Sequence, residues 1–402
     1  MNNTIRVIGL GAATALVGGA LVATAPSASA DDVNVAPARK ITGATTSPFG
    51  LAKDGAGRIY VTNFSQNNLV VYAAGANGAA APTRTLTNGI NNPRGVDVDS
   101  NGFAYVANNN GTVSVYAPSA DGADPPVKTF GTGAGAALGL DVGPTGSIFV
   151  RKSTTVNVYS PAAAGNPAPT SRQITGVPAG NGVHVAANGT TWADAGAALR
   201  AYAPNANAAA VPLRTIAGAK TGLTAPIVGL GTDGAGRVYA TNFNVVSTAV
   251  VFAANAEGNV DPLKVLGGAA TQLDRPSHIA VGSGGRLTVA NFSGQSVLEF
   301  GTLFATAPSK PRALKVAGKK SAKKRKVSWK APSNNGGAAI TGYRLVVKKG
   351  NKTLLKKNFG PGKRSYKIKR SKLRKGKHVV FVKAKNSKGF GKNAKKAFRV
   401  RK

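Results

Sequence analysis

A pattern of short strands repeats along residues 36–301 with a period of roughly 43–50 residues. In one unit, the stretches 48–52, 58–64, 68–72 and 82–86 are rich in β-branched and aromatic residues. Glycine or asparagine separates one stretch from the next, as expected for strands joined by tight turns. Four short strands in a repeat of this length are typical of one blade of a β-propeller.

Equivalent positions of the units form columns of similar residues. The third strand ends on an aromatic residue, at Tyr72, Tyr116, Tyr159, Tyr202, Phe252 and Phe300. We interpret this column as packing between blades and not as a ligand cage. An asparagine follows the second strand at Asn63, Asn108, Asn242 and Asn291. We interpret it as a turn residue, because asparagine tolerates left-handed backbone and caps its own turn.

The number of strands predicts six blades. The first three strands of the unit occur six times, and the fourth strand also occurs six times. The first copy of the fourth strand, at 37–41, precedes the first complete set, and the last set, at 276–300, has none after it. We therefore expect the N-terminal strand to pair into the last blade, which closes the ring and removes its exposed edges. The predicted fold class is all-β, a six-bladed β-propeller followed by an immunoglobulin-like β-sandwich.

The units resemble NHL repeats. The stretch Pro93-Arg94-Gly95-Val96-Asp97-Val98-Asp99, followed by Gly102-Phe103-Ala104-Tyr105-Val106-Ala107-Asn108, matches that family's pattern. The resemblance covers about 265 residues of the chain. It implies a propeller whose relatives include modules that bind protein, RNA or peptidoglycan. Similar six-bladed rings house lactonases and streptogramin-inactivating lyases.

The innermost strands carry the candidate catalytic or metal-binding residues of the ring. One column places Asp97, Asp141 and His184 in three consecutive units, and His278 lies two residues before that column in its own unit. If they converge, they could hold a divalent cation or act as acid and base. Alternatively, the aspartates bind backbone amides and His184 packs. We expect no other cofactor.

The composition weighs against an enzyme. The two glutamates of the ring, Glu257 and Glu299, lie off the innermost strand, whereas the lactonase and lyase relatives need denser sets of Glu, His and Asn. The chain has no cysteine and three histidines, which excludes disulfides, thiolate metal sites and cysteine nucleophiles. An enzyme acting on a carbohydrate or cyclic ester stays open as the alternative.

Residues 1–30 have the pattern of a secretory signal peptide. Arg6 precedes an uncharged apolar run over 7–25, and Ala28-Ser29-Ala30 forms a small-residue cleavage site before Asp31. An uncleaved membrane anchor is the alternative. No later apolar run reaches the ~18 residues that a membrane span needs. We predict a secreted or cell-wall-associated protein of a Gram-positive-type bacterium, with no transmembrane segment after cleavage.

The charge divides the chain into two regions. The chain has 52 Lys and Arg against 14 Asp and Glu. Residues 1–307 contain 18 of the basic residues and all 14 acids, whereas 308–402 contain 34 basic residues and no acid, a difference of +4 against +34. This change predicts a propeller domain over 31–306, a linker over 307–311 and a basic domain over 312–402.

The apolar pattern of the basic region predicts a folded module. The stretches 327–332, 340–347 and 380–386 alternate apolar residues with charged or polar ones. The module resembles a fibronectin type III domain in Pro311, Trp329, Pro332, the Gly336-Gly337 loop, Ile340-Thr341-Gly342-Tyr343, and Ala384 through Asn386 to Gly389. The resemblance implies that Trp329 is the buried tryptophan of the sandwich. It also implies that His378 stands where the family has its corner tyrosine.

The excess of basic residues predicts a polyanionic partner. The expected contact residues are Lys319, Lys320, Lys323, Lys324, Arg325, Lys326, Lys348, Lys349, Lys356, Lys357, Lys372, Arg374, Lys375 and Lys377. A merely solubilising surface is the alternative. Sequence-specific nucleic-acid binding is not expected, because no helix-turn-helix, zinc site or ribonucleoprotein motif is present.

These observations lead to one functional hypothesis and two alternatives. We expect an exported envelope protein whose basic domain anchors it to an anionic wall polymer or acidic polysaccharide. The propeller would be the scaffold that binds a protein or small ligand through one face. The alternatives are the secreted propeller enzyme and an accessory protein that recognises polysaccharide.

Overall fold

The computed structural model describes residues 31–165, 168, 170–319 and 321–401. The predicted signal peptide, 1–30, lies outside the described residues. The chain is all-β, and its helical segments are the short 3-10 turns η1 (Phe64–Gln66), η2 (Ala219–Thr221), η3 (Ala269–Thr271), η4 (Ser283–Gly285) and η5 (Arg370–Lys372). Over the described residues, no helix has the length and apolar character needed to cross a membrane.

Six sheets form from the repeat region of the described chain, each from strands that follow one another in sequence. The first two contain β3 (Pro48–Lys53), β4 (Ile59–Asn63), β5 (Asn68–Tyr72) and β6 (Arg84–Leu86), then β7 (Pro93–Val98), β8 (Ala104–Asn108), β9 (Thr112–Tyr116) and β10 (Lys128–Gly131). The next two contain β11 (Gly139–Val142), β12 (Ile148–Arg151), β13 (Val156–Tyr159) and β14 (Arg172–Ile174), then β15 (Val183–Val185), β16 (Thr191–Asp194), β17 (Ala198–Tyr202) and β18 (Arg214–Ala217). The last two contain β19 (Ile227–Thr232), β20 (Val238–Asn242), β21 (Thr248–Phe252) and β22 (Lys264–Leu266), then β23 (Pro276–Gly282), β24 (Arg286–Asn291) and β25 (Ser296–Thr302).

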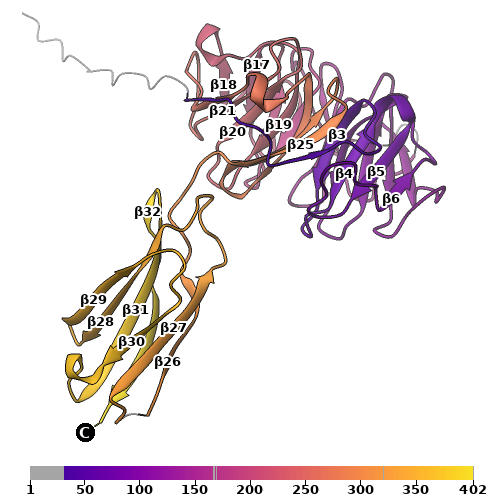
Figure 1. Cartoon of the computed structure of the whole chain (residues 1–402). Helices are drawn as coiled ribbons and strands as arrows, with labels where there is room; N and C mark the ends of the chain where they lie inside the picture. The colour runs from indigo at the N-terminus through magenta and orange to yellow at the C-terminus, as the bar shows by residue number, and fades with distance from the viewer. Residues whose placement is uncertain (1–30, 166–167, 169, 320, 402) are drawn as a thin grey trace, which may run out of the picture.

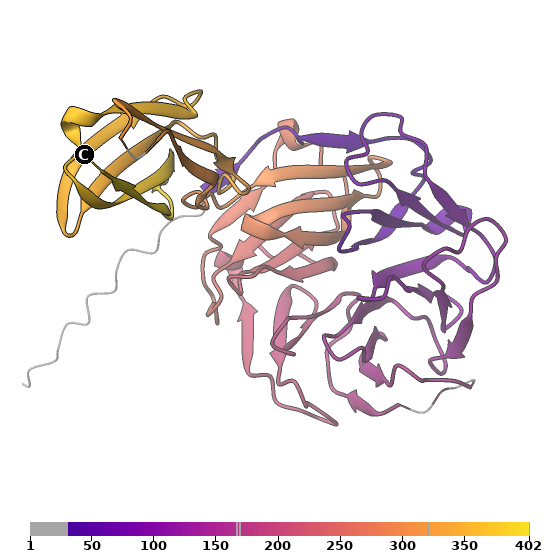
Figure 2. The same ribbon diagram turned by 90° about the horizontal axis from the view of Figure 1, so that it is seen from below.

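The sheets are arranged around a common centre (Figure 2). The innermost strands β3, β7, β11, β15, β19 and β23 each contact the innermost strand of the next sheet, and β23 contacts β3. The ring is therefore closed at its inner edge.

The N-terminal segment completes the last sheet. Strand β2 (Arg39–Ile41) pairs antiparallel with β25, with Arg39 opposite Glu299. This pairing confirms the prediction that the N-terminal strand joins the last set of strands. A second N-terminal strand, β1 (Asp31–Val33), runs parallel to β22 at the outer edge of the fifth sheet, which the sequence did not predict.

The aromatic residues that end the third strands are buried between neighbouring sheets. Tyr116 of the second sheet lies in one apolar cluster with Tyr60 and Leu69 of the first sheet. Its hydroxyl donates a hydrogen bond to the carbonyl of Asn88 at 2.5 Å, so the polar end of the ring is satisfied inside the core. The interpretation of this column as packing between sheets is therefore confirmed.

The asparagine column has a different role from the one predicted. Asn63 has extended backbone, with φ −98° and ψ 103°, so the interpretation as a left-handed turn residue is wrong there. The asparagines are buried and bond the loop that enters the same sheet. The Oδ1 atom of Asn108 accepts from the Asn91 amide at 3.0 Å, and that of Asn242 accepts from the Thr224 amide at 2.9 Å. The column therefore fastens each incoming loop to the end of the second strand.

In the third and fourth sheets the residues one position before this column, Arg151 and Asp194, form a buried ion pair at the place that Thr62 and Thr241 take in the first and fifth sheets. Nε of Arg151 lies 3.7 Å from Oδ1 of Asp194, and both side chains are at most 1% exposed. The carboxylate still fastens its own loop, because Oδ1 accepts from the amides of Asn181 and Gly182 at 2.9 Å. Burial raises the pKa of Asp194 to about 6, although the charge of Arg151 and the two amides oppose that shift.

The C-terminal region forms two further sheets (Figure 1). One contains β26 (Pro311–Ala317), β27 (Lys324–Pro332) and β30 (Ser365–Lys369), and the other contains β28 (Gly342–Lys349), β29 (Lys352–Phe359), β31 (Gly376–Asn386), β32 (Gly389–Phe390) and β33 (Ala394–Val400). Strands β27 and β31 include the predicted stretches 327–332 and 380–386, and β28 covers 342–347 of the predicted stretch 340–347. Both sheets contribute to one apolar core. In it, the ring centroid of Trp329 lies 5.8 Å from that of Tyr343 and 5.9 Å from that of Phe359.

The segment between β25 and β26 is bonded to the loops of the C-terminal module. The Thr306 amide donates to the Gly336 carbonyl at 2.7 Å, and the side-chain amide of Asn386 donates to the Thr306 carbonyl at 2.6 Å. A side chain at Gly337 would place its Cβ 2.4 Å from Thr302, so the close approach requires glycine. Residues immediately before the predicted linker 307–311 therefore already contact the C-terminal module.

Candidate functional site

A cavity of about 160 Å³ lies at the centre of the ring, between the innermost strands. The polar residues that line it are Lys53, Asp97, Asp141, His184, Thr232 and His278. The structure therefore brings the four residues predicted from the sequence into one cavity and adds Lys53 and Thr232. All four lie on innermost strands. Asp97, Asp141 and His184 stand at equivalent positions of three successive sheets, whereas His278 lies on β23, whose neighbours in the ring are β19 and β3.

Three of these side chains make the same contact with the next sheet. Oδ2 of Asp97 accepts from the Val142 amide at 2.8 Å, and Oδ2 of Asp141 accepts from the Val185 amide at 2.8 Å. In the next sheet, Nε2 of His184 accepts from the Thr232 amide at 3.1 Å. Each acceptor bonds the amide one position beyond its own equivalent in the neighbouring strand. The repetition indicates that these residues hold adjacent sheets together.

His184 also connects the side chains of Asp141 and Thr232, so that the three form a line. Nδ1 of His184 lies 2.7 Å from Oδ2 of Asp141, and Nε2 lies 2.9 Å from Oγ1 of Thr232. Because a backbone amide can only donate, Nε2 must be an acceptor and Nδ1 must carry the proton that Asp141 accepts. The order carboxylate, imidazole, hydroxyl is that of a nucleophile activated by a base. Here the lone pair of Nε2 is already engaged by the Thr232 amide, which reduces its ability to take the hydroxyl proton.

The carboxyl of Asp97 is close enough to Asp141 for their ionisation to interact. Burial raises the pKa of Asp97 well above its ordinary value, and the charge and hydrogen bond of Asp141 add to the shift. Within the described ranges, no group of three or more His, Cys, Asp or Glu residues is placed to hold a metal ion.

His278 is oriented toward the other end of the cavity. Its Nδ1 donates to the Phe49 carbonyl at 2.9 Å, and its ring lies 5.4 Å from the ring of Phe49. Burial lowers the pKa of His278 to about 4; the hydrogen bond to Phe49 opposes this shift, and the nearby charge of Arg94 adds to it. The imidazole is therefore neutral at physiological pH. No hydrogen bond among the described residues joins it to Asp97, Asp141 or His184.

The predicted polyanion-binding residues are mostly on the surface of the C-terminal module. Lys348 is half-buried, Lys320 lies outside the described residues, and the others except Arg325 are exposed. Arg325 is 6% exposed, which corrects its assignment as a contact residue. Its guanidinium donates to the carbonyls of Lys319 and Arg399 and lies over the ring of Phe398. The register of β27 points this arginine into the core, between the exposed Lys324 and Lys326.

A shallow hollow of about 320 Å³ lies on the outer face of the larger C-terminal sheet. Val346 and Phe381 contribute apolar surface to it. The cations that line it are Arg344, Lys348, Lys356 and Lys383. Arg344 and Lys383, which the sequence analysis missed, come from neighbouring strands β28 and β31, where they are directly opposite each other. Neither residue lies in a run of basic residues, because apolar residues flank both, but the alternation along each strand places them on one face.

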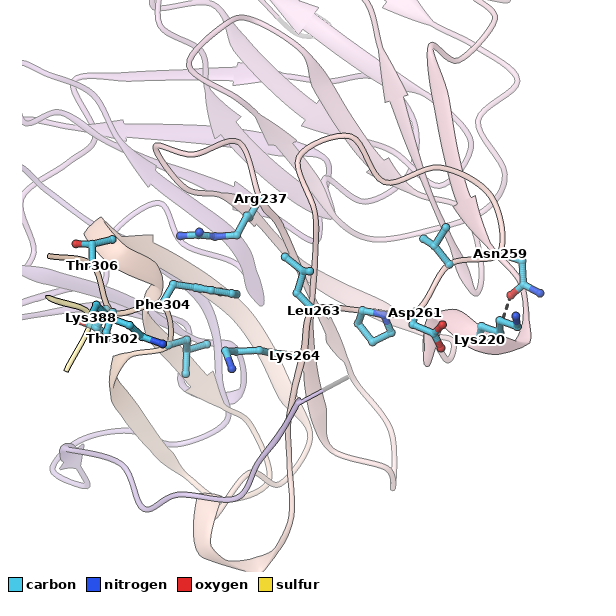
Figure 3. Close-up of a pocket in the computed structure, with 14 residues that line it drawn as sticks. Lys220, Arg237, Asn259, Asp261, Leu263, Lys264, Thr302, Phe304, Thr306 and Lys388 are labelled. Atoms are coloured by element: carbon cyan, nitrogen blue, oxygen red, sulfur yellow. Dashed lines mark hydrogen bonds between the residues drawn. The ribbon is translucent and has the colours of Figure 1, made fainter. Parts of the chain in front are cut away.

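A larger hollow, about 770 Å³, lies between the fifth sheet and the C-terminal module (Figure 3). Phe304, which follows β25, lies against Arg237 with its ring centroid 3.8 Å from the guanidinium carbon. Asp233 holds the same guanidinium at 2.5 Å. Lys388 of the C-terminal module also lines this hollow. Asp233 and Phe304 therefore already engage the guanidinium of Arg237.

Comparison with known proteins supplies a likeness in fold. No protein-family model matches the sequence, and no curated protein matches it. Similar solved structures include the WD40 β-propeller domain of Doa1, with a TM-score of 0.47 and 10% identity over 63% of this chain and 78% of that chain. Another is a chain of the Mitotic Checkpoint Complex, with a TM-score of 0.46 and 12% identity over 74% of this chain and 98% of that chain. The closed ring follows from the strand pairing and the inner-strand contacts of this chain itself.

Proposed function

We propose that this chain is an exported, non-catalytic envelope protein that its basic C-terminal module anchors to an anionic polymer. The module would be a β-sandwich of the fibronectin type III kind. The ring would be a six-bladed propeller of the NHL kind that serves as a binding scaffold. The proposed polymers are teichoic-type phosphate polymers and acidic polysaccharides of a bacterial wall. The hollow lined by Arg344, Lys348, Lys356 and Lys383 carries this proposal.

The arrangement of like charges across the strands supports a polyanionic partner. Lys324 is directly opposite Lys369, and Lys326 is opposite Lys367. Like charges directly opposite each other in a sheet destabilise it. The module contains no acidic side chain that could compensate them. A bound polyanion would relieve this repulsion, because its charges replace the missing acids.

The hollow adds a place where such a polymer can be held. Four cations from three strands surround apolar surface. The cations would bind the anionic group of a repeating unit, and the apolar surface would contact its sugar or glycerol body. Arg344 is kept in place by Phe390, whose ring centroid lies 4.0 Å from its guanidinium carbon, and by Asn358, which accepts from its Nε at 2.9 Å. A held guanidinium loses less freedom when it binds an anion than a free one does.

The test is co-sedimentation of the purified protein with bacterial cell walls. Walls with their anionic polymer and walls stripped of it are compared from about 50 mM to about 500 mM salt, because counterion release makes polyanion binding fall steeply with salt. We expect binding to intact walls at low salt and loss of binding to stripped walls. Absence of binding to intact walls at about 50 mM salt would overturn the anchor.

Two charge variants locate the contact. One carries Arg344→Gln, Lys348→Gln, Lys356→Gln and Lys383→Gln, and the matched control carries Lys323→Gln, Lys326→Gln, Lys372→Gln and Lys375→Gln. Both lose the same net charge. We expect the first to weaken binding at least tenfold more than the control. Equal losses would mean that net charge alone holds the polymer, which would contradict the hollow as the site.

A secreted hydrolase is the second candidate, and the line Asp141, His184, Thr232 is the observation that favours it. In that case Thr232 would be the nucleophile and His184 its base. A screen of lactones and glycosides with the wild-type protein and Thr232→Val separates the two functions. Turnover that disappears in Thr232→Val would establish the enzyme, and its absence from the wild type would remove it.

A further inference from the structure

A second cavity, of about 250 Å³, opens at the end of the ring where the inner strands begin. Four phenylalanines and two arginines line much of it. They are Phe49, Phe64, Phe243, Phe292, Arg94 and Arg275. Phe64, Phe243 and Phe292 are half-buried, so their faces are available at this mouth. The cavity is separate from the one that contains Asp97, Asp141 and His184.

Three of the phenylalanines come from one repeated dipeptide. Each follows the asparagine that ends the second strand, in Asn63-Phe64, Asn242-Phe243 and Asn291-Phe292. The second, third and fourth sheets have Asn109, Ser153 and Gly196 at this place. The first, fifth and sixth sheets are neighbours in the closed ring, because β23 contacts both β19 and β3. The dipeptide therefore concentrates the aromatic rings on one side of the mouth.

The rings form a continuous aromatic surface. The centroid of Phe49 lies 5.8 Å from that of Phe243 and 5.9 Å from that of Phe292, and Phe243 and Phe292 are 5.4 Å apart. Their planes meet at 64° to 90°. Such edge-to-face arrangements can extend to one more flat ring.

The two arginines supply positive charge beside this surface. The guanidinium carbon of Arg94 lies 5.3 Å from the centroid of Phe49 and 5.4 Å from that of Phe64, while Arg275 lies 5.9 Å from Phe243. Nε of Arg94 donates to Asn109 at 3.0 Å. Among the ion pairs of residues 31–401 that the structure describes, none contains Arg94 or Arg275. Arg94 is half-buried, whereas Arg275 is exposed at the rim. A half-buried guanidinium without a carboxylate partner is costly, and an anion bound to Arg94 would offset that cost.

We propose that this mouth binds a small aromatic carboxylate, with its ring against the phenylalanines and its carboxylate on Arg94 and Arg275. The volume supports a ligand of this size, because pockets for drug-sized molecules begin at about 300 Å³ and this one is slightly smaller. The charge selects the acid over a neutral or cationic compound of the same shape. The inference is independent of the polymer anchor, which lies in the C-terminal module.

Titration calorimetry on the full chain, with phenylacetate, phenylacetamide and phenethylamine as probes, tests the proposal. These compounds share the ring and differ in charge. We expect phenylacetate to bind with a Kd of about 1 mM or tighter, and the amide and amine at least tenfold more weakly. No heat of binding from phenylacetate at about 10 mM, or a preference for the amide or amine, would overturn the proposal.

Variants separate the charge from the aromatic surface. Arg94→Gln should weaken phenylacetate at least tenfold and leave the amide unchanged. Arg172→Gln is the matched control, because Arg172 also lies over a phenylalanine, 5.4 Å from the centroid of Phe149, but does not line the mouth. The double change Phe243→Ala and Phe292→Ala should weaken both acid and amide. Equal losses from Arg94→Gln and Arg172→Gln would contradict the assignment of Arg94.

A folding control and a peptide probe complete the design. The urea midpoint of each variant must match that of the wild type, and if Arg94→Gln does not fold, Arg275→Gln provides the same comparison. A short peptide that ends in phenylalanine is titrated in parallel. Binding of the peptide without binding of phenylacetate would show that the mouth takes a protein chain end, which would overturn the small-molecule assignment.

Discussion

Nδ1 of His184 lies 2.7 Å from Oδ2 of Asp141, and these two residues stand at equivalent positions of neighbouring sheets. The contact therefore joins two units that are separated by 43 residues in the sequence. The same carboxylate oxygen also accepts the Val185 amide at 2.8 Å. One side chain thus bonds both the backbone and the side chain of the next inner strand.

Replacement of Asp141 by alanine should destabilise the ring. The change leaves the Val185 amide and Nδ1–H of His184 without their acceptor, and each unsatisfied buried donor costs about 1–3 kcal/mol. We expect urea denaturation to show a clearly lower midpoint. The control is Glu257→Ala at an exposed position, which should change stability by less than about 0.5 kcal/mol. An unchanged midpoint in Asp141→Ala would contradict a role in holding the sheets together.

The Asp97→Asn variant should become more stable relative to the wild type as the pH rises. Burial and the charge of Asp141 raise the native pKa of Asp97, so the native state keeps a proton that the unfolded state loses above the ordinary pKa of 3.8. Stability from this group is complete below that value and is lost as the pH rises through the native pKa. Asparagine stays neutral and can still accept the Val142 amide. Urea midpoints of both proteins between pH 4 and pH 8 should diverge in favour of the variant, and a constant difference would refute the raised pKa.

Replacement of Arg151 alone should destabilise the protein more than replacement of Arg151 and Asp194 together. Arg151→Met leaves a buried carboxylate without its cation, which typically costs about 3–5 kcal/mol. The double variant Arg151→Thr and Asp194→Thr introduces the residue that stands at this position in the first and fifth sheets, where the hydroxyls of Thr62 and Thr241 accept the equivalent amides. We expect it to recover at least half of the loss in thermal or urea unfolding. A double variant no more stable than Arg151→Met would mean that the loops of these two sheets require the ion pair itself.

Replacement of Glu299 by glutamine should weaken the closure of the ring at neutral pH. Burial alone would raise the pKa of Glu299, but hydrogen bonds and charge from Arg39 and Lys53 hold it below its ordinary 4.5. Its contribution to stability is therefore present above pH 4.5 and is lost as the pH falls through the native pKa. We expect Glu299→Gln to be less stable by about 1–3 kcal/mol at pH 7, since a charged hydrogen bond is lost. The difference should shrink at pH 3.5, and a pH-independent difference would contradict the pairing with Arg39.

The repeat, the aromatic columns and the closure by β2 were all predictable from local patterns. The fourth strand that precedes the first set and the missing fourth strand after the last set required the pairing of β2 with β25. Trp329 and the alternating apolar residues around it predicted a packed C-terminal core, and the structure places Trp329 there at 3% exposure. These features follow from the pattern within a strand or from a comparison of the units along the chain, so the sequence alone contains the information.

The roles of individual polar residues were less predictable. The asparagine column was expected in left-handed turns, yet its members are buried and bond the incoming loops. Arg325 was grouped with its lysine neighbours, although the alternation of β27 directs it inward. In both cases the side chain finds its partner in a segment that the local sequence does not identify.

The sequence by itself determined the all-β architecture, the order of the strands and the division into a nearly neutral and a strongly basic part. These depend on hydrophobic periodicity and on charge, which are properties of short stretches. Only the tertiary structure decided that Thr232 meets His184, that Arg94 lies beside Phe49 and Phe64, and that Arg344 and Lys383 share a hollow. Those contacts join residues that are distant in the sequence, and their geometry exists only once the inner strands have closed into a ring and the two C-terminal sheets have packed.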